Sequence, residues 1–225
     1  MRVLRRLRHQ RAGRRVTYLV NDIFYTLQGE GHHAGRPAVF CRFSRCNLWS
    51  GREEDRASAV CRFCDTDFLA VNHRFKTAAE LAAAVSSLLP AGAGSIRTPM
   101  VVLTGGEPTL QIDRDLIGAL LAVPMYVSVE TNGTRPIGFH ADWVCVSPKA
   151  GTSLAVKAAD EVKLVYPQPS LDPESVRDSI AAGSYRLQPM DGPDLEANTA
   201  AAVEYCLAHP HWSLSVQTHK VIGVK

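Results

Sequence analysis

Residues 46–66 read CNLWSGREEDRASAVCRFCDT and contain three of the six cysteines of the chain, Cys46, Cys61 and Cys64. Their spacing is C-x14-C-x2-C, in a loop otherwise rich in Arg, Asp and Glu. Cysteines that cluster in one loop, in a chain with no recognisable secretory signal, favour a metal site in a reducing compartment over disulfide bonds. We therefore expect a cytoplasmic protein in which these three thiolates hold a metal centre.

Two kinds of metal centre fit the three cysteines. A structural zinc ion normally takes four protein ligands, and Cys41 is expected on the opposite face of its strand from Cys46. A [4Fe–4S] cluster is bound by thiolates, and three of them would leave one iron open to a cofactor or substrate. The cysteines by themselves leave both alternatives open. Cys41, Cys145 and Cys206 are interpreted as small buried apolar residues.

The segments around this loop alternate between strand and helix patterns. Strands are expected at residues 18–26, 38–43, 100–104, 126–130, 143–147, 161–165, 185–188 and 214–218, and helices at 77–89, 111–122, 173–182 and 194–208. The first helix should begin with a Thr77–Glu80 capping box, and the third should end at Gly183 as its C-cap. Such alternation predicts an α/β fold with a mostly parallel sheet. Because the helices after the third, fourth and fifth core strands are short or missing, we expect an incomplete, TIM-like β/α barrel of about six parallel strands, with an N-terminal strand segment and an inserted cluster loop.

Polar residues gather where the predicted strands end. They are Cys46, residues 104–107, 130–132 and 147–149, Gln188, Gln217 and His219. The carboxyl ends of parallel strands meet at one rim of a barrel, and residues two apart on a strand share a face, so these side chains should form one site. Alternation also points Arg42 inward beside Cys46, where a guanidinium is costly unless it meets an anion.

Further short motifs follow one another along the chain. They are YTLQGEG at residues 25–31, CDT at 64–66, GGEP at 105–108, ETNG at 130–133, SPK at 147–149, QP at 188–189 and QTHK at 217–220. Together with the cysteine loop, in which Phe63 precedes the last cysteine, this ordered set resembles the 7-carboxy-7-deazaguanine synthase family of the radical S-adenosylmethionine (SAM) superfamily, from about Tyr18 to the C-terminus. The usual cysteine spacing of the superfamily is C-x3-C-x2-C, and the eleven additional residues here are similar to the longer loop of some members of the family.

The resemblance implies a lyase that converts 6-carboxy-5,6,7,8-tetrahydropterin to 7-carboxy-7-deazaguanine with loss of ammonia, on the pathway to queuosine and related 7-deazapurines. It implies three cofactors, which are a [4Fe–4S] cluster, SAM and Mg²⁺. The cluster would reduce the sulfonium of SAM and release a 5′-deoxyadenosyl radical, which takes hydrogen from C6 of the pterin and later returns it. The protein would orient the reactants and exclude water.

The resemblance also implies roles for individual residues, although no side chain is expected to react itself. The [4Fe–4S] ligands are Cys46, Cys61 and Cys64, and Thr66 binds Mg²⁺. SAM is expected to contact Phe63, Asp65, Gly106, Glu130, Ser147, Pro148, Lys149, Gln188, Pro189, Met190 and Asp191. The pterin is expected to contact Leu27, Gln28, Gly29, Glu30, Arg42, Thr104, His219 and Lys225, with Arg42 facing its carboxylate. Without the resemblance, Gly105 and Gly106 fit an ordinary turn, and Thr66 fits a helix N-cap.

The implied partners are the pterin and an electron donor such as flavodoxin or ferredoxin, with the chain as a homodimer. Neither nucleic acid nor a membrane is expected, since no apolar run is long enough to span a bilayer. Two other functions stay open. One is a radical SAM enzyme similar to a glycyl-radical activase, which would share the cysteines and residues 105–108. The other is a zinc-containing module that binds nucleic acid. The missing fourth zinc ligand and the net negative charge of the chain outside its N-terminal segment argue against this function.

The net charge of +3 comes from one end of the chain. Residues 1–15 contain seven Arg and no acidic residue, and the rest of the chain has 18 Lys and Arg against 22 Asp and Glu, a net charge of −4. We expect residues 1–16 to be a basic, disordered extension. Residues 17–225 should form one core domain, the radical SAM domain, because 225 residues with 46% hydrophobic side chains suffice for one large core.

Overall fold

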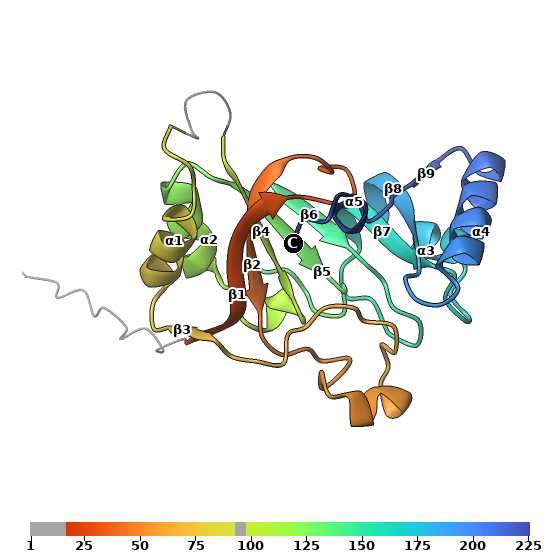
Figure 1. The fold of residues 1–225 in the computed structure, drawn as a ribbon, viewed down its shortest axis with the longest axis horizontal. Helices are drawn as coiled ribbons and strands as arrows, with labels where there is room; N and C mark the ends of the chain where they lie inside the picture. The colour runs from red at the N-terminus through yellow and green to blue at the C-terminus, as the bar shows by residue number, and fades with distance from the viewer. Residues whose placement is uncertain (1–16, 93–97) are drawn as a thin grey trace, which may run out of the picture.

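A computed structural model describes residues 17–92 and 98–225. The expected basic extension over residues 1–16 lies outside the described residues. One sheet of nine strands organises the described chain, in the order β3-β1-β2-β4-β5-β6-β7-β8-β9 (Figure 1). Among the described residues, no helix has both the length and the apolar character needed to cross a membrane.

Seven neighbouring strands of the sheet pair in parallel. They are β2 (Pro37–Phe43), β4 (Met100–Gly105), β5 (Tyr126–Thr131), β6 (Trp143–Val146), β7 (Ala158–Tyr166), β8 (Ala181–Pro189) and β9 (Trp212–Leu214). At the other edge, β1 (Tyr18–Leu27) pairs antiparallel with β2 and with β3 (His73–Phe75). The strand order ends at β3 and β9, so the described sheet is open. This confirms the predicted partial barrel, which has one parallel strand more than about six.

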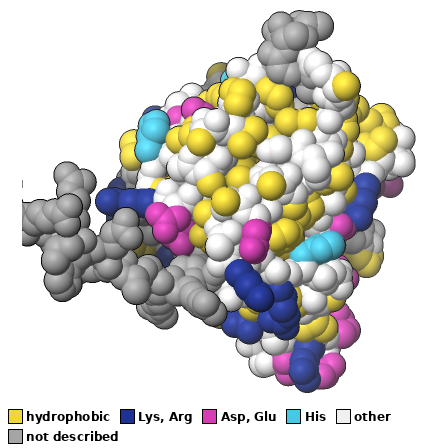
Figure 2. Space-filling view, turned by 90° about the vertical axis from the view of Figure 1, so that its left-hand side faces the viewer, with side chains coloured by type: hydrophobic (Ala, Val, Ile, Leu, Met, Phe, Trp, Pro, Cys, Tyr) yellow, Lys and Arg dark blue, Asp and Glu magenta, His cyan; other side chains and the backbone are white. Residues whose placement is uncertain are grey.

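The helices cover the two halves of the sheet separately. Figure 1 shows α1 (Ala78–Ser86) and α2 (Arg114–Ala122) beside one half, and α3 (Pro173–Ser179) and α4 (Leu195–Ala208) beside the other. Each half has its own buried hydrophobic cluster, centred on residues such as Leu103 and Leu164. The connections at residues 132–142 and 147–157 are fully described and contain no helix, as predicted. Figure 2 shows the α1 and α2 side, where hydrophobic side chains are spread over the surface and charged side chains gather toward its lower part.

Local polar contacts explain where the first two helices begin. The side chain of Thr77 accepts a hydrogen bond from the Glu80 amide at 3.1 Å, and the Glu80 carboxylate accepts one from the Thr77 amide at 3.3 Å. The predicted capping box is therefore confirmed. The second helix begins later than predicted, because Asp113 is its N-cap and accepts from Leu116 at 2.9 Å. Gln111 lies before this helix, and its side-chain oxygen accepts a hydrogen bond from the backbone amide of Leu19 in β1 at 2.7 Å.

Two predicted elements near the C-terminus are wrong. The helix predicted at 173–182 ends at Ser179, and Gly183 lies inside β8 and is not a C-cap, because β8 already pairs with β7 from Ala181 onward. The strand predicted at 214–218 is β9, which ends at Leu214, followed by α5 (Thr218–Ile222). The chain leaves the sheet edge there because the Thr218 amide donates to the carbonyl of Gly29 at 2.9 Å.

Candidate functional site

Two adjoining cavities open at the carboxyl ends of the parallel strands. The first is lined by the three clustered cysteines and by residues that follow β4, β5, β6 and β8. The second lies over the segment 27–30 and α5. The residues that line both are Glu30, Asp65, Thr66, Thr104, Glu130 and Gln217. The rim predicted from the strand ends is therefore one continuous site with two compartments.

The three thiols reach the first cavity from a loop with its own internal structure. Residues Glu53–Ser58 form a short 3-10 helix, and Arg56 donates to the carbonyls of Arg62 and Cys64 at 2.9 and 3.2 Å. The guanidinium carbon of Arg56 also lies 4.1 Å from the centroid of the Trp49 ring. The inserted residues thus hold the backbone that carries Cys61 and Cys64 in place.

The electrostatics of the thiols differ from one cysteine to the next. The hydrogen bond from Cys61 lowers the pKa of Cys64 to about 7, against the opposing effect of burial. The same hydrogen bond, followed by burial, raises the pKa of Cys61. Burial raises the pKa of Cys46, whose sulfur accepts a hydrogen bond from the Leu48 amide at 3.4 Å. Cys41 lies in the core on the far side of β2, as predicted. Among the described residues, no three His, Cys, Asp or Glu side chains are grouped around a position for a single metal ion.

The paired glycines at the end of β4 are required by the cysteine loop. A Cβ atom at Gly105, where φ is +123°, would lie 2.3 Å from the carbonyl oxygen of Phe43. A Cβ atom at Gly106 would lie 2.0 Å from the carbonyl oxygen of Arg45, directly before Cys46. These approaches are closer than any side chain allows, so the glycines position the loop in addition to lining the cavity. Both backbones therefore meet at the cavity floor.

Most residues expected to contact SAM line the first cavity. They are Phe63, Asp65, Gly106, Glu130, Ser147, Lys149, Gln188, Pro189 and Asp191. Burial lowers the pKa of Lys149, whose ammonium group donates to Ser147 Oγ at 2.8 Å. Pro148 and Met190 lie in the same segments but are not among the residues that line this cavity. The carbonyl of Pro148 accepts from Gln168 at 3.2 Å, and that of Met190 accepts from Asn198 at 2.9 Å.

All eight residues expected to contact the pterin line the second cavity. Arg42 points inward from β2 as alternation predicts, and its Nε is buried without a hydrogen-bond partner among the described residues. Gln28 donates to Glu130 at 2.9 Å, which links the segment before β2 to the end of β5. Thr66 lines both cavities and lies where they join. Residues 67–72 directly after it form no helix, so Thr66 is not an N-cap.

The helix α5 covers this second cavity. His219 lies on α5, so the prediction that it follows the end of a strand at 214–218 is wrong. It packs against Gly29, where a Cβ atom would lie 2.1 Å from His219 Nδ1. Gln217 donates to Glu30 at 2.8 Å and to Asp65 at 3.0 Å. Lys220 donates to Asp65 and Asp191, both at 2.6 Å. This short helix therefore ties together the substrate segment, the cysteine loop and the segment after β8.

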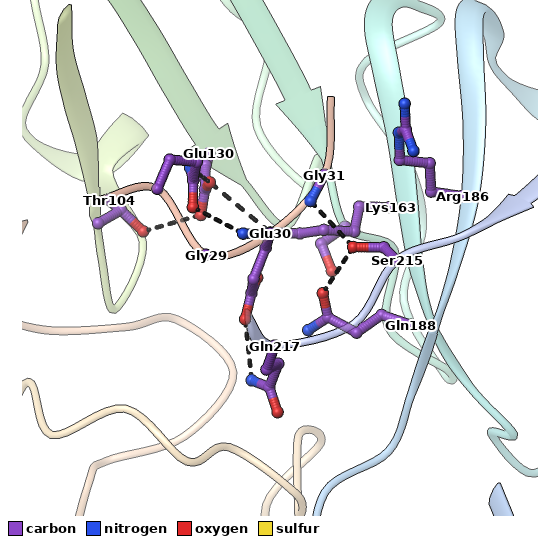
Figure 3. A network of polar contacts seen from close by, with 12 residues as sticks. Gly29, Glu30, Gly31, Thr104, Glu130, Lys163, Arg186, Gln188, Ser215 and Gln217 are labelled. Carbon is purple, nitrogen blue, oxygen red and sulfur yellow. Dashed lines mark hydrogen bonds and ion pairs between the residues drawn. The ribbon is translucent and has the colours of Figure 1, made fainter. Parts of the chain in front are cut away.

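Sequence reasoning missed Lys163, which lines the first cavity and contacts two carboxylates that line both cavities. It lies in the middle of β7 and is 4% exposed. Its ammonium group contacts Glu30 and lies 3.6 Å from Glu130 Oε1 (Figure 3). The available signal was the alternation of Glu161 and Lys163 along the predicted strand 161–165, whose other residues are apolar, which places two charges on one face.

Comparisons with known proteins agree on one family. A protein from Bradyrhizobium diazoefficiens named 7-carboxy-7-deazaguanine synthase is 51% identical over 214 residues, which cover 93% of this chain and 100% of the relative. A protein of the same name from Caulobacter vibrioides is 53% identical over 213 residues, with the same two coverages. The crystal structure of QueE from Escherichia coli superposes with a TM-score of 0.65 at 26% identity, covering 89% of this chain and 94% of that one. No protein-family model matches the chain.

Proposed function

The chain belongs to the 7-carboxy-7-deazaguanine synthase family, and we propose that it is a radical SAM lyase that converts 6-carboxy-5,6,7,8-tetrahydropterin to 7-carboxy-7-deazaguanine with loss of ammonia. One observation carries the proposal beyond the relatives' names. A cavity with three thiols adjoins a second cavity lined by Arg42, a half-buried residue whose Nε is buried without a hydrogen-bond partner among the described residues. The first arrangement suits a cluster and its cofactor, and the second suits an anionic substrate.

The donor set of the first cavity fits a [4Fe–4S] cluster and SAM. Cys46, Cys61 and Cys64 are the only cysteines of the described chain that come from the loop at its floor, and three thiolates leave one iron open. When bound, the cluster and SAM supply the electron and the radical that takes hydrogen from C6 of the pterin. Lys149 and Ser147 are placed to hold the cofactor carboxylate by charge and hydrogen bond. The Glu130 carboxylate is an acceptor for ribose hydroxyls.

The second cavity orients the pterin and keeps water away from C6. Arg42 presents a planar fork to the substrate carboxylate, so one pair fixes both position and angle. Gln28 and Glu30 offer hydrogen-bonding groups to the amide and amino edge of the ring. His219 and the chain end at Lys225 line the opposite wall and cover the substrate. The residues thus bind and align, and no side chain needs to form a bond to the substrate.

We also propose Thr66 as the Mg²⁺ ligand, because its position between the two cavities brings a hydroxyl within reach of both. A flavodoxin or ferredoxin as electron donor, a homodimer and a cytoplasmic location are further proposals that rest on the family. The six free thiols suit a reducing compartment. We assign residues 17–225 to one radical SAM core domain and regard residues 1–16 as dispensable for the reaction.

A reconstitution experiment tests this function against a glycyl-radical activase. The full chain is reconstituted anaerobically with iron and sulfide and incubated with SAM, Mg²⁺, a chemical reductant and the carboxylated tetrahydropterin. We expect about four iron and four sulfide per chain and a new product with the mass of 7-carboxy-7-deazaguanine. An activase would cleave SAM without altering the pterin, and that result would contradict the proposal. Zinc in place of iron would contradict the cluster assignment itself.

A further inference from the structure

A buried ammonium group lies between two carboxylates at the cavity face of the sheet. Lys163 projects from β7, which lies between β6 and β8, and its side chain is 5% exposed. The ammonium group donates a hydrogen bond to Glu30, and it lies 3.6 Å from Oε1 of Glu130. Figure 3 shows the three side chains converging, with Gln217 and Thr104 at the outer ends of the network. The family assignment gives Lys163 no role, although it lines the first cavity and contacts Glu30 and Glu130, which line both.

The two carboxylates come from opposite walls of the site. Glu30 belongs to the segment before β2 and also accepts from Gln217 at 2.8 Å. Glu130 ends β5 and also accepts from Gln28 at 2.9 Å and from Thr104 at 3.4 Å. Both line the two cavities, Glu30 toward the expected pterin edge and Glu130 toward the expected ribose. Lys163 is therefore the shared counter-charge of a substrate residue and a cofactor residue.

The other charged groups nearby have partners of their own. Glu161, on the same face of β7, is bound by Arg186 at 3.2 Å and by the Trp143 indole at 3.2 Å. Lys149 faces the cysteines, and Asp65 is bound by Lys220 at 2.6 Å. Cys145 lines the same cavity, and burial raises its pKa well above the ordinary value, so it stays neutral. Lys163 is the cation within 4 Å of both Glu30 and Glu130 in the described chain.

A buried carboxylate without a cation takes up a proton, and this changes what it can bind. An ionised carboxylate only accepts hydrogen bonds, whereas a protonated one also donates. Burial would raise the pKa of Glu30, but Lys163 and Gln217 lower it below its ordinary value. Burial would lower the pKa of Lys163, but Glu130 and Glu30 raise it well above its ordinary value. Glu30 and Lys163 therefore stay charged together, and Glu130 shares the same ammonium group at 3.6 Å.

We propose that Lys163 is a positioning residue that keeps Glu30 and Glu130 as acceptor-only carboxylates, so that the site selects ligands that present N–H and O–H donors to them. The inference rests on the proposed function, in which the pterin presents ring N–H and amino groups and SAM presents a ribose diol. It adds a selection rule. A ring analogue with an acceptor in place of the amino group should be rejected because its lone pair would face a fixed negative charge.

Three variants test the proposal in the reconstituted, SAM-loaded protein. Lys163→Met removes the charge at similar length, Lys163→Arg keeps it, and Lys157→Met is the matched exposed control. The affinity for 7-carboxy-7-deazaguanine is measured by calorimetry from about pH 6 to about pH 9. For the wild type, Lys163→Arg and Lys157→Met we expect affinities that hardly change with pH. Lys163→Met should bind at least about tenfold more weakly near pH 6.5 and recover as pH rises, because its buried carboxyl then ionises.

A merely structural role would weaken Lys163→Met equally at every pH, and that result would overturn the proposal. If Lys163→Met does not fold, the wild type decides. With ¹³C-labelled glutamate side chains, the Glu30 signal, assigned by its loss in Glu30→Gln, should stay that of a carboxylate down to about pH 6. A Glu30 carboxyl that takes up its proton above about pH 6 would overturn the proposal. Failure of the wild type to bind the deazaguanine would instead count against the proposed function, since the ¹³C titration does not depend on it.

Discussion

The guanidinium carbon of Arg42 lies 5.3 Å from the centroid of the Phe24 ring, on the inner wall of the second cavity. The aromatic face supports the cation while leaving the edges of the guanidinium for a ligand. Nε of Arg42 is buried and has no hydrogen-bond partner among the described residues. A buried donor of this kind indicates an anion that completes the site.

Substitution of Arg42 by Lys should therefore impair more than affinity. The variant keeps the charge but loses the planar fork, so the pterin carboxylate can bind at several angles. We expect a raised KM and a kcat lowered roughly 10- to 100-fold, because the position of C6 is no longer fixed. The control is Arg114→Lys, since Arg114 donates to the carbonyl of Gly138 on the surface. Wild-type turnover by Arg42→Lys would show that the fork has no role.

Thr66 should determine the response to magnesium. Thr66→Ala removes the hydroxyl of residue 66. The stimulation of turnover by Mg²⁺ should therefore fall to about a tenth or less, with SAM binding nearly unchanged. Thr66→Ser retains the hydroxyl and should behave as the wild type. The measurement is initial rate against Mg²⁺ concentration for the three proteins. Equal Mg²⁺ dependence in all three would remove Thr66 from the metal site.

The chain end should not tolerate an added tag. Lys225 lines the second cavity, contacts Asp22, and holds its ammonium group 4.5 Å from the centroid of the Phe24 ring. Residues appended after Lys225 would displace this end from the cavity, and we expect roughly a tenfold or greater loss of kcat/KM. Lys225→Met, which adds no residue, separates the effect of the Lys225 side chain from the effect of the tag. Full activity of the C-terminally tagged protein, compared with the untagged one, would argue against a closed chain end.

Glu174 should make stability depend on pH in acid. It accepts hydrogen bonds from the Trp212 indole at 3.0 Å and the Tyr205 hydroxyl at 3.2 Å, and it lies 2.9 Å from His211. Burial opposes ionisation, but His211 and Trp212 lower the pKa of Glu174 below its ordinary value. A carboxyl with a lowered pKa stabilises the fold fully above about pH 4.5, and that stabilisation is lost as pH falls through its folded value.

Thermal melts of Glu174→Gln follow from this. The variant should melt about 2 °C below the wild type at pH 7, and the difference should shrink toward zero as the pH drops below about 4.5. Glu204→Gln, at an exposed position of α4, is the control and should track the wild type throughout. A difference that stays constant with pH would mean that the charge of Glu174 does not contribute.

Local sequence patterns were sufficient to predict much of the fold and the lining of the site. Period-2 alternation placed Arg42 on the inner face because β2 is flanked on both sides and keeps a regular pleat. Cys41 faces the core for the same reason. The capping box at Thr77 was predictable because both of its partners lie within one turn.

The remaining features depend on contacts between distant parts of the chain. The segment after Leu214 has a strand-like composition, but it forms α5 instead of extending the strand. Thr218 in this helix donates a hydrogen bond to the carbonyl of Gly29, 189 residues away. Lys163 acquires its role only when Glu30, 133 residues away, is folded against it. Neither contact leaves a local pattern, so composition and periodicity cannot predict it.

Conversion of the pterin should require the thiols of Cys46, Cys61 and Cys64, because they bind the [4Fe–4S] cluster. The most direct measurement is the rate of 7-carboxy-7-deazaguanine formation, by mass spectrometry, for anaerobically reconstituted Cys61→Ala and Cys41→Ala. Both thiols are buried, but only Cys61 lines the first cavity. We expect no product from Cys61→Ala and product at close to the wild-type rate from Cys41→Ala, provided that both are folded. Product formation by Cys61→Ala, or its absence in wild type that contains a full cluster, would contradict this account.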